Sequence, residues 1–208
     1  MTPHVLFLHV PKCAGNAIRA TMHGVVFHGP GHIPVAWAKA QTDHRKPAGI
    51  ENYWDTAYRF GFIRNPWDRQ VSFFHHSFKD KLQKRGLTQS EIHLEFRKWL
   101  LGEGAARNLI APARLILADQ QETTDHLHFV GQYEHLKEHM AHVAKEVRHK
   151  LTRLELSNPG KFRPTRDWRP YYDELTHDYV MHTSRWEIKR WKYKFDQKPT
   201  PTPAGRSY

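Results

Sequence analysis

The sequence predicts an α/β fold with a central, mainly parallel sheet flanked by helices. Short apolar runs typical of buried strands alternate along the chain with longer segments whose apolar residues recur at helical spacing. At two places, after Val5–Val10 and after Tyr58–Ile63, a strand of this kind runs directly into a segment that starts a helix. Strands that alternate with helices pair in parallel, because each helix carries the chain back to the same edge of the sheet.

The composition is that of a globular protein. The chain has 208 residues, of which 39% are hydrophobic and 12% aromatic, so it is long enough to bury a substantial core. We expect one domain over residues 1–196. The tail 197–208 contains three prolines, and we expect it to be disordered.

The net charge indicates which kinds of binding partner to expect, and the cysteine content bears on the cellular compartment. The chain has 32 Lys and Arg against 21 Asp and Glu, a net charge of +11, which favours a nucleotide, an acidic or sulfated glycan, or nucleic acid, although basic surface residues also serve solubility alone. Cys13 is the single cysteine, so no internal disulfide can form. No apolar run approaches the length of a membrane span and no signal peptide precedes the first strand, so we expect a cytoplasmic protein without a membrane partner.

The first strand–helix junction has the features of an anion site. Val5–Val10 is predicted as a buried strand, and a helix is predicted from Asn16 to His23. Between them, a glycine-containing loop leaves backbone N–H groups free at the positive end of the helix dipole, and Lys12 adds a full charge. The sequence therefore indicates a site for phosphate or sulfate, with an ordinary structural turn as the alternative.

The middle of the chain continues the alternation. Val25–Pro34 is predicted as a loop and Val35–Lys39 as a short helical turn. After the strand Tyr58–Ile63, Asn65 is a predicted N-cap with Pro66 at the first helical position of a helix that runs to about Leu82. Thr88 to Glu91 has the spacing of a capping box for the next helix.

The remaining elements are read from apolar spacing. Leu115–Leu117 and His128–Val130 are predicted as short strands, and Glu134–Leu151 as an amphipathic helix. Asn158–Arg169 is predicted as a basic loop, in which Lys161 and Arg163 could either close over a ligand or stay solvated. The last predicted helix covers Pro170–Trp191.

The second junction adds another pair of anion ligands. Arg64 stands at the end of the strand Tyr58–Ile63, and Ser72 lies two turns into the helix that follows. A guanidinium fork and a hydroxyl are a suitable pair for a phosphate group, and both could reach the same anion.

With these two junctions the chain resembles the sulfotransferases that use 3′-phosphoadenosine 5′-phosphosulfate (PAPS), and in particular the carbohydrate sulfotransferases and their bacterial relatives. The resemblance rests on four stretches in the expected order. They are the first loop (His9, Pro11, Lys12, Gly15), the second junction (Arg64, Asn65, Pro66, Arg69, Val71, Ser72), Phe129–Leu136, and the region from Tyr171 to Phe195. Cys13, Asn16 and Ala17 depart from the Thr, Thr and Ser that are usual there.

The resemblance implies a P-loop-like, three-layer domain and a site for PAPS. Lys12 would act at the leaving oxygen, and His32 would be the base, with His28 as the second choice, because a His-Gly-His segment lies between the two phosphate motifs in related enzymes. The implied acceptor is a hydroxyl of a carbohydrate or similar molecule, anionic ones included, and no metal is needed. The implied cofactor-binding residues are Pro11, Lys12, Cys13, Ala14, Gly15, Asn16, Ala17, Arg64 and Ser72.

Other classes of protein fit the sequence less well. Cys13 and Arg19 have the Cys-x5-Arg spacing of a low-molecular-weight cysteine phosphatase, but the late acid motif of that class is missing. The Gly-x4-Gly-Lys-Ser/Thr signature of kinases and NTPases is absent. A non-enzymatic polyanion-binding protein is a further alternative, although no nucleic-acid-binding motif is present. His135, His139 and His142 share one flank of a predicted helix and could hold zinc.

Overall fold

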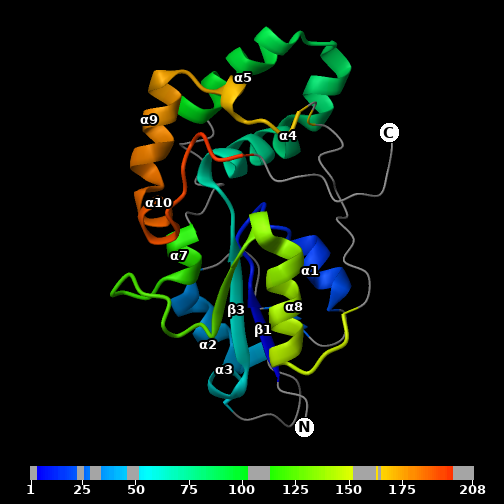
Figure 1. Cartoon of the computed structure of the whole chain (residues 1–208), viewed down its shortest axis with the longest axis vertical. Coiled ribbons are helices and arrows are strands. Elements are labelled where there is room, and N and C mark those ends of the chain that lie inside the picture. The colour runs from blue at the N-terminus through cyan, green and yellow to red at the C-terminus, as the bar shows by residue number, and fades with distance from the viewer. Residues whose placement is uncertain are drawn as a thin grey trace. The chain divides into compact units, whose positions relative to one another are not determined.

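The computed structural model describes residues 4–22, 26–28, 34–45, 52–102, 113–151, 163 and 165–198 (Figure 1). Their contacts divide the chain into two compact units, and both units are assembled from two separate stretches of sequence. The first unit is Met1–Arg64 with Ala111–Ser157, and the second is Asn65–Ile110 with Asn158–Tyr208. The expectation of one domain over residues 1–196 stays a prediction, and most of the tail lies outside the described residues.

The first unit is built on a parallel sheet of four strands. The strands are β1 (Val5–Leu8), β2 (Val26–His28), β3 (Tyr58–Ile63) and β4 (Phe129–Gln132), in the order β2-β1-β3-β4. All three neighbouring pairs are parallel. All four side chains of β1 are buried, as expected for a strand inside a sheet that is covered on both faces. The predicted α/β class with a parallel sheet is confirmed.

Helices cover the two faces of this sheet. They are α1 (Gly15–Thr21), α2 (Val35–Arg45), α3 (Tyr53–Thr56), α7 (Ala113–Leu117) and α8 (Leu136–Glu146), the last preceded by the short helix η1 (Tyr133–His135). The connections β1–β2 and β2–β3 cross the sheet in opposite directions, so right-handed crossovers put α1 on one face and α2 and α3 on the other. In Figure 1, α1 and α8 lie to the right of the strands, and α2 and α7 to the left.

Three predictions for the first unit need correction. The predicted loop Val25–Pro34 contains strand β2, and the helical turn predicted at Val35–Lys39 extends to Arg45 as α2. Leu115–Leu117 is not a strand but part of helix α7. Its Leu117 packs on Gly61 of β3 so closely that a Cβ atom on Gly61 would lie 2.4 Å from the Leu117 Cδ2 atom. The run therefore forms a helix lying on the sheet.

The second unit contains the helices α4 (Pro66–Arg85), α5 (Gln89–Leu101), α9 (Glu174–Thr183) and α10 (Arg185–Trp191), with the short 3-10 helix η2 (Arg169–Tyr171). Both predicted caps are confirmed: the Asn65 side chain accepts from the first turn of α4, and Thr88 and Glu91 form the capping box of α5. The single helix predicted over Pro170–Trp191 is three elements, because Asp173 caps a new helix and Ser184 separates α9 from α10.

The core of the second unit combines aromatic packing with buried ion pairs. Phe74, Phe96 and Trp99 pack ring against ring between α4 and α5. The Arg163 Nη1 atom lies 2.5 Å from the Asp68 Oδ1 atom, and the Arg69 Nη2 atom lies 3.5 Å from the Glu187 Oε1 atom. All four of these charged side chains are almost completely buried. None of the helices in the described part of the chain has the length and apolar character needed to span a membrane.

Candidate functional site

The order of the strands places a candidate site at the carboxyl ends of β1 and β3. The chain leaves β1 toward β2 and leaves β3 toward β4, so its path diverges between these two neighbouring strands. In open parallel sheets such a switch point opens a crevice where ligands bind. The loop that follows β1 and Arg64, which follows β3, both lie at this point. These are the two places in the first unit where the sequence predicts anion ligands.

The loop after β1 is held in an unusual backbone conformation. Lys12 and Ala14 have φ angles of 66° and 65°, while Cys13 between them does not share this left-handed region. Non-glycine residues in this region cost on the order of 1–3 kcal/mol each and gather at functional sites. A backbone in which left-handed and ordinary residues alternate turns successive N–H groups toward one concave side, which suits an anion.

Helix α1 leaves its first N–H groups available to this loop. The Ala14 carbonyl accepts the first helical hydrogen bond, from the Ile18 N–H at 3.0 Å, and Ala14 provides no side-chain cap. The N–H groups of Gly15, Asn16 and Ala17 therefore precede the first intrahelical donor. These groups are available to donate to an anion at the loop.

Gly15 is required by the packing of the loop. A Cβ atom on Gly15 would lie 1.8 Å from the His9 Nε2 atom, so the imidazole occupies the place of any side chain there. The His9 ring also stacks on Phe7 of β1, with ring centroids 5.4 Å apart. His9 and Gly15 thus pack the two ends of the loop against each other.

Lys12 is a half-buried cation at the centre of the loop. No hydrogen bond or ion pair joins its ammonium group to any of the described residues. Burial and then the nearby charge of Arg64 lower the pKa of Lys12 to about 8. A desolvated ammonium beside a second cation is destabilised, and an anion bound between them relieves that cost.

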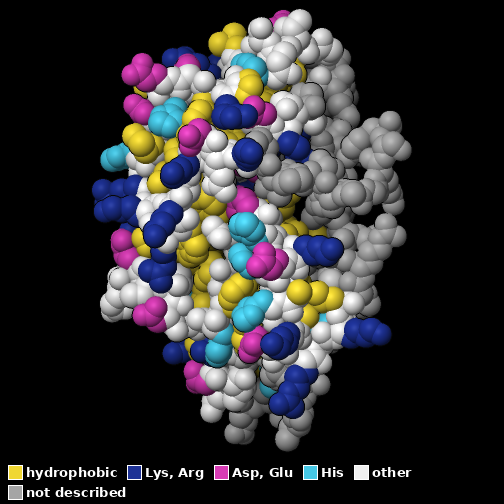
Figure 2. Space-filling view, viewed as in Figure 1, with side chains coloured by type: hydrophobic (Ala, Val, Ile, Leu, Met, Phe, Trp, Pro, Cys, Tyr) yellow, Lys and Arg dark blue, Asp and Glu magenta, His cyan; other side chains and the backbone are white. Residues whose placement is uncertain are grey.

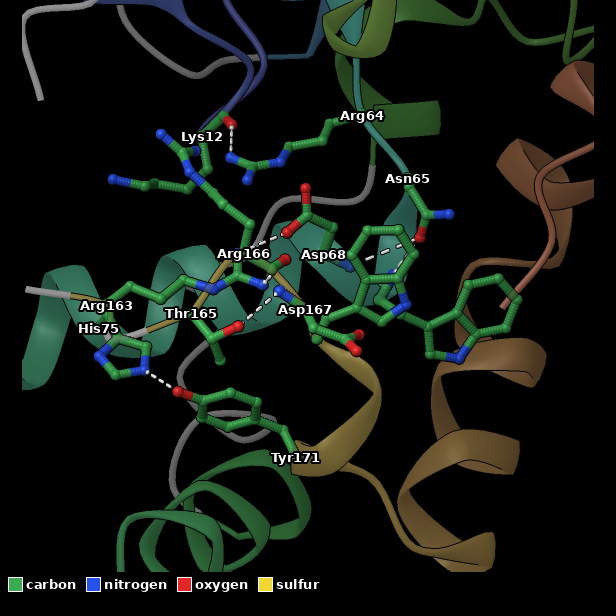
Figure 3. A network of polar contacts seen from close by, with 12 residues as sticks. Lys12, Arg64, Asn65, Asp68, His75, Arg163, Thr165, Arg166, Asp167 and Tyr171 are labelled. Carbon is green, nitrogen blue, oxygen red and sulfur yellow. Dashed lines mark hydrogen bonds and ion pairs between the residues drawn. The ribbon is translucent and has the colours of Figure 1, made fainter. Parts of the chain in front are cut away.

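Arg64, which directly follows β3, stabilises the loop by a hydrogen bond to its backbone. Its Nη1 atom donates to the Lys12 carbonyl oxygen at 3.1 Å (Figure 3), and its guanidinium carbon lies 4.1 Å from the ring centroid of Tyr133. The side chain is 6% exposed. Arg64 therefore fixes the strained backbone of Lys12 while it contributes a second positive charge to the site.

Sequence reasoning did not identify Tyr133 as part of the site. The pairing of Ile63 with Gln132 brings the residues that follow, Arg64 and Tyr133, to neighbouring positions at the end of the sheet. Arg64 directly follows the predicted strand Tyr58–Ile63, whereas the predicted strand His128–Val130 ends before β4 does, at Gln132, so its bounds did not place Tyr133 at a strand end. The register that makes them neighbours is a tertiary property.

The other predicted loop residues differ in how they can reach a ligand. Pro11 is buried, and its carbonyl oxygen accepts the Cys13 thiol at 3.6 Å. Cys13 and Ala17 are also buried, whereas Asn16 is exposed. Ala17 can therefore act on a ligand only through its backbone N–H group, and the Asn16 amide can act directly. The Cys13 N–H group already donates to the Val10 carbonyl oxygen at 3.4 Å.

This arrangement argues against the cysteine phosphatase. A phosphatase thiolate must face the bound anion together with the loop arginine. The Cys13 thiol is fully buried against the Pro11 carbonyl group, and Arg19 is exposed in the last turn of α1.

Of the predicted residues His32, His28 and Ser72, the structure describes only His28 and Ser72. His32 lies outside the described residues, and His28 is described as the last residue of β2, where its backbone pairs with Phe7. Ser72 belongs to the second unit, on α4, and is partly exposed. Its predicted contact with the same anion as Arg64 stays a prediction.

Arg163 has a structural partner in the second unit. Besides its ion pair with Asp68, it donates from Nη2 to the Arg166 carbonyl oxygen at 2.6 Å, as Figure 3 shows for the residues around Asp68. Burial and these contacts favour a role in the core over a solvated charge. Lys161 lies outside the described residues.

The histidines of η1 and α8 make packing and backbone contacts. His139 accepts the Gln132 N–H through Nδ1 at 2.8 Å, and the rings of His139 and His142 both pack against Phe129. Among the described residues, no three His, Cys, Asp or Glu side chains are arranged to hold a metal ion. On this side of α8, the His139 and His142 side chains are used to pack around Phe129.

Basic side chains are unevenly distributed on the described surface. In Figure 2 many of the Lys and Arg side chains gather toward the left of the view, with acidic, histidine and apolar side chains among them.

The fold and this site define an α/β protein with two cations, Lys12 and Arg64, where its parallel sheet switches direction. The sequence profile described as the sulfotransferase family matches residues 2–182 of the chain, and so the chain belongs to the sulfotransferase family and is a transferase. No curated protein and no solved structure was found to match it.

Proposed function

We propose that the protein transfers a sulfuryl group from PAPS to a hydroxyl group of a carbohydrate or a similar acceptor. The observation that carries the proposal is the half-buried ammonium of Lys12, held in a strained loop that Arg64 braces at the switch point of the sheet. Lys12 and a row of backbone N–H groups suit the phosphosulfate end of that donor, and the Arg64 guanidinium suits its 3′-phosphate.

The residues present fit such a donor in charge and in hydrogen-bonding capacity. Lys12 and Arg64 supply cations, and the N–H groups at the start of α1 replace the hydroxyl donors that Cys13 and Ala17 lack. When bound, PAPS supplies an activated sulfuryl group whose S–O bond to the 5′-phosphate breaks as the acceptor oxygen attacks sulfur.

The roles of the protein residues follow from this chemistry. The Lys12 ammonium would stabilise the negative charge that develops on the leaving oxygen, since electrostatic stabilisation is the main demand of such a transfer. The acceptor hydroxyl must lose a proton, and by family resemblance His32 would take it. Arg64 and Ser72 would bind the 3′-phosphate.

Calorimetric titration with 3′,5′-adenosine bisphosphate tests the proposal. Wild-type protein should bind it, and Lys12→Ala and Arg64→Ala should each weaken binding by about tenfold or more, because each removes a charge-assisted contact. Lys145→Ala, which removes an exposed cation of α8 in the same unit, should leave the affinity within about twofold.

Transfer itself is measured with PAPS labelled in its sulfuryl group and a panel of sugar acceptors. His32→Ala should abolish transfer and keep nucleotide binding. Absence of nucleotide binding to the folded wild-type protein would overturn the proposal, and full activity of His32→Ala would remove that residue from the mechanism.

A further inference from the structure

A pocket of about 290 Å³ lies in the first unit, between the start of α2 and the segment formed by α7 and the residues after it. Its volume is near the lower end of the range typical of small-molecule sites. It is separate from the loop around Lys12, and no role in the proposed reaction has been given to its residues.

The lining combines apolar and polar side chains. The apolar part comes from the first turn of α2, with Val35 and Ala36, and from α7 and the residue after it, with Leu115 and Ala118. Leu115 is 45% exposed, so part of its apolar surface is accessible to a ligand in the pocket. A pocket of this kind suits a molecule with one apolar face.

The polar rim of the pocket disfavours an anion. Of the described residues that line it, Arg114 is the only Lys or Arg, and its guanidinium is paired with the Glu122 carboxylate. Asp119 accepts hydrogen bonds from the Thr123 backbone N–H and hydroxyl, both at 2.8 Å, and these bonds lower the pKa of Asp119. The rim therefore keeps a net negative charge at neutral pH.

The same rim can recognise hydroxyl groups. Asp119 and Glu122 accept hydrogen bonds, and the Gln120 amide both donates and accepts. Paired carboxylate and amide groups of this kind hold an uncharged polyol without the repulsion that a sulfated or carboxylated ligand would meet.

The pocket also lies near the carboxyl end of the sheet. Leu117 of α7, next to the lining residue Ala118, packs on Gly61 of β3. Gly61 stands three residues before Arg64, which is about 10 Å along a strand. Through Leu117 the pocket therefore borders β3, the strand that Arg64 directly follows.

We propose that this pocket binds the acceptor, and that the acceptor is an uncharged, hydroxyl-bearing small molecule with one apolar face. The inference rests on the proposed sulfuryl transfer and narrows it, because the pocket selects against the anionic glycans that the basic composition would otherwise suggest. The apolar face packs on Leu115 and Val35, and the hydroxyl groups bond to Asp119 and Gln120.

Two matched probes test the charge preference. Para-nitrophenyl β-D-glucoside and para-nitrophenyl β-D-glucuronide have the same aryl group and sugar ring and differ by one carboxylate. By calorimetry or saturation-transfer NMR, the wild-type protein should bind the neutral glucoside about tenfold more tightly than the glucuronide. Glu122→Gln releases Arg114 from its partner and should narrow or reverse that preference.

A pair of variants tests the location. Leu115→Asn should weaken glucoside binding by about tenfold, because it removes apolar surface and adds no charge. Leu175→Asn is the control, since Leu175 is 54% exposed on α9 in the other unit and should change nothing. Circular dichroism and thermal melts establish that both variants are folded.

The outcomes separate this inference from the proposed function. A glucuronide preference in wild type, equal effects of the two leucine variants, or no binding of either probe would overturn the pocket assignment, even if 3′,5′-adenosine bisphosphate binds normally. Loss of nucleotide binding by the wild-type protein would overturn the proposed function whatever the probes do.

Discussion

At the scale of single residues, Lys12 has two features that cost free energy in the folded protein. Its backbone φ angle is in the left-handed region, and its half-buried ammonium group has a lowered pKa. Two contacts hold the loop in this conformation and offset the cost: the hydrogen bond from Arg64 to the Lys12 carbonyl oxygen and the packing of His9 over Gly15. A bound anion would recover part of it.

The lowered pKa of Lys12 predicts how anion binding depends on pH. Below about pH 8 the ammonium is charged, and as the pH rises through that value the charge is lost, so affinity for 3′,5′-adenosine bisphosphate should fall. The phosphates of this ligand titrate near about pH 6, so above about pH 7 the change belongs to the protein. Titrations between about pH 7 and pH 9.5 measure it.

Lys12→Arg is the control for this pH dependence, because a guanidinium stays charged over the whole range. Its affinity should be flat with pH, whatever its absolute value. An equal loss of affinity in Lys12→Arg would assign the titration to another group.

A second prediction concerns the packing of His9 on Gly15. Gly15→Ala should disrupt the loop, because its Cβ atom would overlap the imidazole, and nucleotide affinity should fall by about tenfold or more. Removing the ring as well, in the double variant His9→Ala with Gly15→Ala, should recover part of the binding. A double variant as weak as Gly15→Ala would show that backbone freedom, rather than the clash, is what Gly15 provides.

Some residues of the candidate site could be predicted from the sequence, and others could not. Lys12 and Arg64 were predicted because each stands at a strand end with the chemistry of an anion ligand, and the structure brings them together. The buried orientation of Cys13 and the stacking of Tyr133 on Arg64 could not be read from the sequence. Both depend on the folded loop and on the register of β3 with β4.

At the scale of secondary structure, local signals predicted the long helices and their starts. Asn65 with Pro66, and Thr88 with Glu91, satisfy backbone N–H groups within one turn, so their meaning does not depend on the rest of the fold. β2 was missed because a three-residue strand is too short to show a period and runs into a Gly- and Pro-rich stretch. The prediction of a strand at Leu115–Leu117 was wrong because a short apolar run fits a strand or a buried helix equally well.

The two caps give a prediction about helix stability. Asn65→Ala should lower the free energy of unfolding by about 2 kcal/mol, because Asn65 is completely buried and its side chain accepts from Trp67 N and Asp68 N at 3.1 and 3.4 Å. Thr88→Ala removes an exposed cap and should cost about 1 kcal/mol or less. Urea denaturation of both variants measures the difference, and a larger effect of Thr88→Ala would contradict it.

At the scale of the whole molecule, the chain passes between its two units in the middle of the second predicted motif. Arg64 ends the first stretch of one unit and Asn65 begins the other. Arg64 and Ser72 therefore belong to different units although eight residues apart, and the sequence motif, which treats them as one group, gave no sign of this boundary. The division comes from which contacts each stretch makes, and contacts far apart in sequence are what local patterns do not encode.

The buried ion pair of the second unit tests whether the two units are independent. Arg163→Ala removes the cation beside the buried Asp68 carboxylate and should destabilise the second unit by about 3 kcal/mol or more. Arg97→Ala, which breaks an exposed pair with Asp173 in the same unit, should cost under about 1 kcal/mol. By hydrogen exchange, Arg163→Ala should speed exchange in α4, α5 and α9 and leave the strands β1 and β3 protected. Faster exchange of equal size in all of these elements would show instead that the two units unfold as one cooperative structure.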